Sequence, residues 1–118
     1  LDESFLNDAF TKGEQLVIDK TQVINADNAA RRTPGGNPTV DKVFLLSIDE
    51  AEEYFASDSA RACSTTSYAR GRGSWWLRSP GDYTNRAALV DSDGSISVYG
   101  LDVDWDGVAV RPAMWINL

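Results

Sequence analysis

Carboxylates that could hold a metal ion alternate along the segment Asp102-Val103-Asp104-Trp105-Asp106-Gly107. Alternate aspartates followed by a glycine match the first half of an EF-hand loop, in which carboxylate oxygens surround a calcium ion. The second half does not match, because the twelfth position would be Ala113 where a bidentate glutamate is needed. Asp102, Asp104 and Asp106 are therefore candidate calcium ligands, and the alternative is a strand and turn with a solvated acidic face.

Few groups in the sequence are suited to catalysis. There is no histidine, which is the commonest general base and metal ligand, and Cys63 is the single cysteine. These counts exclude an internal disulfide framework and a cysteine-based zinc site. A thiol without a histidine partner is typical of a structural residue rather than a nucleophile. Carboxylate pairs for glycoside hydrolysis stand in no recognisable context. We therefore expect a protein that is not an enzyme.

The net charge and the length of the chain limit its possible partners and its number of domains. The net charge of -7 over 118 residues repels phosphate backbones, so we expect no nucleic-acid partner. A chain of this length with 42% hydrophobic residues is expected to form one globular domain, residues 1–118. No apolar run approaches the roughly 18 residues of a membrane-spanning helix. Since Leu1 is not an initiator methionine, we interpret the chain as a processed product or an excised piece.

Polar and aromatic residues of the C-terminal loops are better candidates for function. Tyrosine, tryptophan, arginine, aspartate and asparagine on short loops held by a rigid sheet combine aromatic area with adaptable hydrogen bonding. This composition favours a recognition surface, and the alternative is a set of ordinary loop residues. The candidates are Asp82, Tyr83, Thr84, Asn85, Arg86, Tyr99, Leu101, Asp102, Asp104 and Trp105.

The strand that must position these loops is Trp75-Trp76-Leu77-Arg78-Ser79-Pro80-Gly81. Adjacent tryptophans on a strand point to opposite faces, so burying both predicts a central strand with packing on each side. Pro80 and Gly81 predict that the strand ends there. Arg78 and Arg111 both lie in apolar strand sequences, where each guanidinium needs a carboxylate or several carbonyls as partner. The candidate carboxylates are Asp41, Glu50 and Glu53.

Shorter patterns predict the remaining elements. Phe5, Leu6, Ala9 and Phe10 recur at helical spacing, and Thr11 to Glu14 and Ser47 to Glu50 have the form of capping boxes at helix starts. The apolar run 43–46 predicts a buried strand. Asp93-Gly94 between two short apolar segments predicts a hairpin with a two-residue turn. The polar residues 25–39 predict a long surface loop, which we interpret as a solvated connection rather than a binding loop.

Three motifs together resemble a bacterial domain family of uncharacterised function. They are the segment 75–81, the turn at 91–95, and Val110-Arg111-Pro112-Ala113-Met114-Trp115-Ile116. That family is similar to C-type-lectin-like domains of the formylglycine-generating-enzyme type. The resemblance implies an α+β fold with two main helices around small twisted antiparallel sheets. Family members commonly carry additional N-terminal strands with a tryptophan-containing segment, so the resemblance implies either that such strands are missing before Leu1 or that a different start completes the sheet.

Some relatives of that fold are variable proteins of diversity-generating retroelements, which display altered residues on a C-terminal binding face. The resemblance implies a protein or cell-surface ligand and an extracellular or cell-surface location. The implied face consists of Tyr83, Asn85, Arg86, Leu89, Asp91, Ser92, Ser97, Tyr99, Leu101, Asp102, Asp104 and Trp105. The implied structural supports are Trp75, Trp76, Arg78, Arg111, Pro112 and Trp115.

Two alternatives to this recognition module remain open. The first is a calcium-stabilised carbohydrate-binding domain, although the Glu-Pro-Asn and Trp-Asn-Asp motifs of true C-type lectins are absent, so the resemblance does not imply glycan binding. The second is a purely structural domain of a larger secreted protein. The active cysteine pair of the related oxidase is also absent, because Cys63 stands alone.

Overall fold

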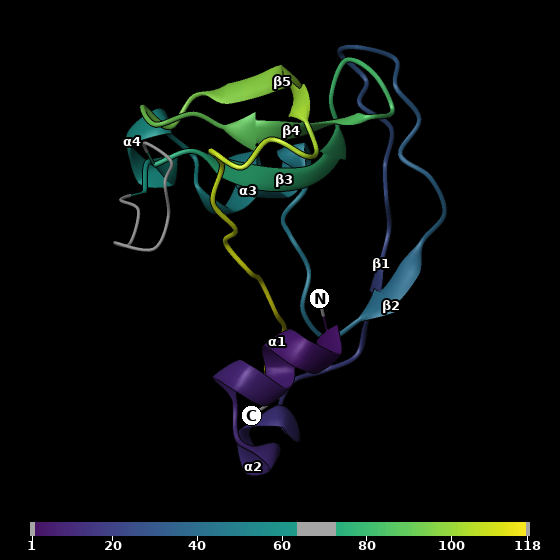
Figure 1. Ribbon diagram of the computed structural model, residues 1–118, viewed down its shortest axis with the longest axis vertical. Coiled ribbons are helices and arrows are strands. Elements are labelled where there is room, and N and C mark those ends of the chain that lie inside the picture. Colours follow the sequence, from purple (N-terminus) through teal and green to yellow (C-terminus); the bar gives the residue numbers. More distant parts are fainter. Residues whose placement is uncertain (1, 64–72, 118) are drawn as a thin grey trace.

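A computed structural model describes residues 2–63 and 73–117, which form a mixed α/β structure with few helices and small antiparallel sheets (Figure 1). Figure 1 shows the larger sheet near one end and the first two helices at the other, with long irregular segments between them. The elements are α1 (Asp2–Ala9), α2 (Lys12–Gln15), β1 (Thr21–Val23), β2 (Thr39–Asp41), α3 (Ile48–Tyr54), α4 (Asp58–Arg61), β3 (Trp75–Pro80), β4 (Arg86–Val90) and β5 (Ile96–Asp102).

Both predicted capping boxes are confirmed. The Thr11 side chain accepts a hydrogen bond from the Glu14 backbone, and the Glu14 side chain accepts one from the Thr11 backbone. Ser47 and Glu50 exchange the same pair of bonds at the start of α3. Each box satisfies backbone donors that a helix start leaves without partners, which fixes where α2 and α3 begin.

The larger sheet has three antiparallel strands in the order β3-β4-β5. The predicted hairpin between β4 and β5 is confirmed, but its turn is longer than predicted. The Asp91 backbone donates to the Ser95 carbonyl at 2.8 Å, so the connection holds more than two residues. Of Asp93 and Gly94, only Gly94 takes a positive φ, of 89°. The Asp93 side chain instead accepts hydrogen bonds from the backbone and hydroxyl of Ser95, which stabilise the wider turn.

β3 lies at the edge of this sheet, and the prediction of a central strand is wrong in that respect. Its outer edge is covered by irregular chain, since the Trp76 backbone donates to the Ala109 carbonyl and the Arg78 backbone to the Leu46 carbonyl. Trp75 is buried and its indole donates to the Arg61 carbonyl at 3.1 Å, whereas Trp76 is half-buried. The predicted end at Pro80 is confirmed.

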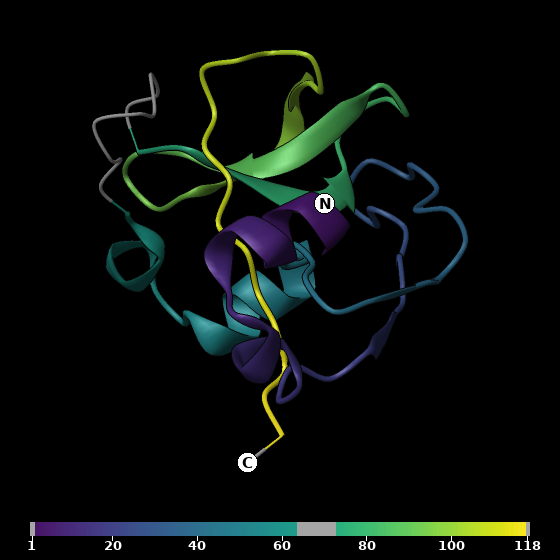
Figure 2. The same cartoon turned by 60° about the horizontal axis from the view of Figure 1, so that its bottom comes forward.

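Two hydrophobic clusters form the core. One lies between the sheet and α3, with Trp75 and Leu77 against Ala51. The other contains Leu6 and Val43, with Met114 packed against it. The C-terminal segment reaches both clusters, and Figures 1 and 2 show it running from the sheet to α1.

The predicted strand at 43–46 is wrong. Val43, Phe44 and Leu46 are buried as expected, but residues 43–46 form no strand, and their backbone contact with β3 is the bond from Arg78 to the Leu46 carbonyl. Phe44 pairs with Ala113 in an isolated bridge. An apolar run therefore marks burial here without marking a strand, because periodicity alone does not show whether a partner strand is available.

No helix in residues 2–63 or 73–117 combines the length and the apolar character needed to cross a membrane.

Candidate functional site

The turn between β3 and β4 lies against the end of β5. The Asp82 backbone donates to the Tyr99 carbonyl at 2.7 Å, and the Gly81 backbone to the Arg86 carbonyl at 2.8 Å. The Val103 backbone donates to the Asn85 carbonyl at 3.1 Å, which brings the chain after β5 to the same place. Gly81 permits the close approach, since a side chain there would meet the Tyr99 carbonyl.

The long loop 25–39 is fastened to this region by two buried side chains. The Asn28 amide donates to the carbonyls of Pro80 and Val98 at 2.8 and 2.9 Å. The Thr33 hydroxyl donates to the Gly81 carbonyl at 2.6 Å. Asn28 and Thr33 are 2% and 4% exposed, so the interpretation of the whole loop as a solvated connection is wrong at these positions. We call residues 25–39 the strap, because these bonds fasten them to β3, to β5 and to the turn after β3.

This strap presents Arg31 to Tyr99. The Arg31 guanidinium lies 4.3 Å from the centre of the Tyr99 ring, and its Nε donates to Asp82 Oδ1 at 2.8 Å. The hydrogen bond with Asp82 raises the pKa of Arg31 above its usual value. Arginine stacked on an aromatic face is a favourable arrangement that leaves the ring edge free for a ligand.

A second stack of the same kind lies beside the first. The Arg86 guanidinium is 5.3 Å from the centre of the Tyr83 ring, and its Nε donates to Asp102 Oδ1 at 3.1 Å. Tyr83 and Tyr99 are 61% and 56% exposed. We call this surface the aromatic face and define it as Arg31, Asp82, Tyr83, Asn85, Arg86, Tyr99, Leu101 and Asp102.

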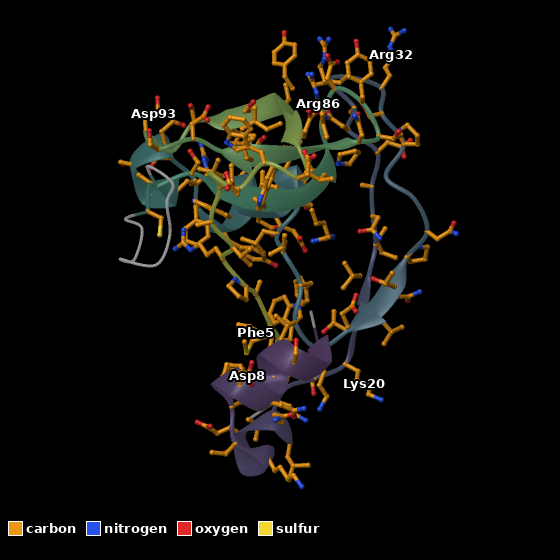
Figure 3. All side chains as sticks on the ribbon, in the orientation of Figure 1. Phe5, Asp8, Lys20, Arg32, Arg86 and Asp93 are labelled. Carbon is orange, nitrogen blue, oxygen red and sulfur yellow. The ribbon has the colours of Figure 1, made fainter. Side chains whose placement is uncertain are left out.

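Six of the twelve predicted face residues lie outside the aromatic face: Asp104 and Trp105 follow it in the chain, and the other four are Leu89, Asp91, Ser92 and Ser97. Leu89 is 2% exposed and its side chain belongs to the interior, because it pairs with Trp76 and Ser97 in the middle strand of the sheet. Asp91 and Ser92 lie at the opposite end of the β4–β5 hairpin. Figure 3 shows this separation, with Asp93 above α4 and Arg86 at the far end. Ser97 is half-buried between the two ends.

The turn end of the hairpin is fixed to α4. The Arg61 Nε donates to the Gly94 carbonyl at 2.9 Å, and Gly94 packs so closely on Asp58 that no side chain would fit. Burial, together with the charge of Asp93, raises the pKa of Asp91 above its usual value. The hydrogen bonds from Ser95 lower the pKa of Asp93. These contacts are those of a structural turn.

The candidate calcium ligands Asp102, Asp104 and Asp106 are exposed, the first at the end of β5 and the other two in the turn that follows it. Asp102 is already paired with Arg86. In the parts of the chain that the structure describes, no three acidic or thiol side chains approach closely enough to hold a metal ion. Trp105 lies in the same turn and is 59% exposed, and its backbone donates to the Asp102 carbonyl at 3.0 Å, so this exposed ring adjoins the aromatic face in the chain.

The sequence matches a known domain family along its whole length. A model of a domain of unknown function, DUF6273, matches residues 1–118. The chain belongs to the DUF6273 family. No curated protein and no solved structure matches it.

The predicted supports of this DUF6273 domain hold the sheet in different ways. Arg78 pairs with Glu50, one of the three predicted carboxylates, and donates to the carbonyls of Leu45 and Ile24. Burial works against the charge of Glu50, but the hydrogen bonds from Arg78 and Ser47 outweigh it and lower the pKa of Glu50. The carboxylate is therefore ionised at neutral pH.

Arg111 differs from the prediction of a carboxylate or carbonyl partner. Its guanidinium lies 4.6 Å from the Phe55 ring centre and 4.9 Å from that of Trp75, and its buried Nη1 makes no hydrogen bond with any described residue. Aromatic stacking takes the place of an ion pair. Pro112 is half-buried beside it, while Trp115 is 51% exposed and so is only partly the support that was predicted.

Sequence reasoning missed Asn28, Arg31 and Thr33. The partners of Asn28 lie 52 and 70 residues away, so no local pattern marks them. Arg31 stands beside Arg32 and resembles any solvated basic pair in sequence.

Proposed function

We propose that this DUF6273 domain is a non-catalytic recognition module that binds a protein or cell-surface ligand through the aromatic face and the adjoining Trp105. Two arginine–tyrosine stacks, with aspartates beside them, offer exposed rings and paired charges of both signs. Such groups supply contact area at low entropic cost, because each has few rotatable bonds or is already held by a neighbour.

The observation that carries the proposal is how the face is held. Asn28 and Thr33 donate to backbone carbonyls, and the Asp82–Tyr99 and Asn85–Val103 contacts are also made by backbone atoms. These bonds do not depend on which side chains the face carries. The side chains of Tyr83, Tyr99 and Trp105 can therefore change while the loops keep their shape.

This arrangement supports the resemblance to C-type-lectin-like variable proteins. In our proposal the sheet, α3 and the arginine supports are the constant frame of a C-type-lectin-like fold, and the face residues are its variable part. Leu89, Asp91 and Ser92 are left out of the face, because the first is buried and the other two lie at the far end of the hairpin.

Comparing this locus among closely related isolates tests the proposal. We expect substitutions to concentrate at Tyr83, Asn85, Tyr99, Leu101 and Trp105. Leu16 and Val40 are 84% and 64% exposed and lie outside the face. They serve as controls, because they show how often a position varies simply because it is exposed. Substitutions as frequent at these two positions as on the face would overturn the proposed variable face.

A library of variants tests the same idea without a known ligand. We expect most domains randomised at Tyr83, Tyr99 and Trp105 to resist protease as well as the parent, because exposed substitutions usually change stability by less than about 0.5 kcal/mol. A matched library at Asn28 and Thr33 should be mostly degraded. Equal degradation of both libraries would mean that the face is part of the core.

A further inference from the structure

A hollow of about 310 Å³ lies between α3 and the C-terminal segment, among residues outside the aromatic face. This size falls within the range of small-molecule sites. Tyr54 and Trp115 form an edge-to-face pair with ring centres 6.4 Å apart, and both are 51% exposed. The other lining residues are Phe44, Leu46, Glu50, Phe55, Ala113 and Met114.

Glu50 is the one charged side chain in this lining. Its hydrogen bonds from Arg78 and from the Ser47 backbone both end on Oε1, and no described residue donates to Oε2. The carboxylate is therefore held in place with one oxygen left to accept from a ligand. Phe55 already stacks on Arg111 and Phe44 lies against Arg78, so Tyr54 and Trp115 are the rings left to face a bound group.

Both signs of charge border the hollow, because Arg78 pairs with Glu50 and Arg111 stacks on Phe55, while the acidic residues of α3 add negative charge. α3 carries Asp49, Glu50, Glu52 and Glu53 and no lysine or arginine, and the whole chain has a net charge of -7. A neighbouring hollow of about 180 Å³ shares Phe44, Glu50 and Trp115 but is also lined by Arg78. A cation is repelled there, so the larger hollow is the favourable one of the two.

We propose that the larger hollow binds a small organic cation, an ammonium group carried on an aromatic or apolar body. The ammonium lies against Tyr54 and Trp115 and donates to Glu50 Oε2, while the body fills the space lined by Leu46 and Met114. Aromatic rings around a cation and one fixed carboxylate provide attraction that a neutral molecule of the same shape does not receive. This inference does not depend on the proposed aromatic face.

Titration with three probes of one shape tests the site. The probes are 2-phenylethylammonium, 2-phenylethanol and 3-phenylpropionate, followed by chemical-shift changes of backbone amides and tryptophan indoles. We expect the ammonium to bind at least about tenfold more tightly than the alcohol, a difference of about 1.4 kcal/mol, and the propionate to bind more weakly than both. Equal affinity for ammonium and alcohol would overturn the proposal.

Variants locate the binding. Trp115→Leu and Tyr54→Leu should each weaken the ammonium by about fivefold or more, whereas Trp105→Leu, at a similarly exposed tryptophan, should leave it unchanged. Glu50→Gln keeps a side chain able to complete the capping box, and should remove the preference for ammonium over alcohol. If Glu50→Gln does not fold, the affinities of Trp115→Leu and Trp105→Leu for the ammonium probe test the site. An equal loss of affinity in these two variants would refute it.

Discussion

Replacing Asn28 with alanine should loosen the strap from the sheet. The Asn28 side chain makes three hydrogen bonds, to the carbonyls of Pro80 and Val98 and from the Arg31 backbone at 3.2 Å. Each such bond contributes about 1 kcal/mol net, so their loss amounts to about 3 kcal/mol. Water entering the vacated space recovers part of this, and we expect the free energy of unfolding to fall by about 2–3 kcal/mol.

Urea unfolding followed by circular dichroism measures this change, with the midpoint falling at a nearly constant slope. Asn25→Ala is the matched control, because the Asn25 amide makes one exposed hydrogen bond, to the Asn37 carbonyl in the same loop. We expect it to cost less than about 1 kcal/mol. An Asn28→Ala variant no less stable than Asn25→Ala would refute the reasoning that this side chain fastens the strap.

Three further outcomes follow from the charges. Arg78→Met leaves Glu50 without its partner, and because this pair is half-buried we expect the free energy of unfolding to fall by about 2 kcal/mol, less than for a fully buried pair. Arg86→Met, at an exposed pair, should cost less than about 1 kcal/mol. Urea unfolding that ranks the two variants the other way would contradict the assignment of Arg78–Glu50 as the stronger pair. Because the pKa of Asp91 is raised in the folded protein, its ionised form opposes folding at neutral pH. Asp91→Asn should therefore stabilise the domain there, and urea unfolding at several pH values should show the gain disappear as pH falls below 3.8, the ordinary value. Calcium at about 1 mM, a concentration at which extracellular modules bind it, should give the same melting temperature as a chelator does. A higher melting temperature with calcium would implicate Asp102, Asp104 and Asp106 as ligands.

The elements that could be predicted are those whose stabilising contacts are short in sequence. Both capping boxes join residues three apart, and the β4–β5 hairpin closes within a few residues around Gly94. Arg78 could be predicted to need a partner because burying an unpaired guanidinium is costly, although the sequence offered three carboxylates and could not select Glu50.

The contacts that build the aromatic face could not be predicted, because they join distant residues through backbone atoms. Any residue supplies the carbonyl that Asn28 or Thr33 binds, so Pro80, Gly81 and Val98 carry no pattern that points to the strap. Leu89 was assigned to the face from the resemblance alone, whereas its place in the middle strand buries it.

Two extended segments form hydrogen bonds with the larger sheet in positions where a larger sheet would have additional strands. The strap 25–39 is bonded to Pro80, Gly81 and Val98 of the sheet and its turn, and the segment 108–117 pairs in turn with Trp75, Phe44 and Ile18. Isolated bridges leave much of each segment unpaired, so its side chains are free to line hollows instead of filling a sheet interior. Each proposed site borders one of these segments, since Arg31 of the aromatic face lies in the strap and Ala113, Met114 and Trp115 line the larger hollow. Neither a helical nor a strand period indicates what these segments contribute.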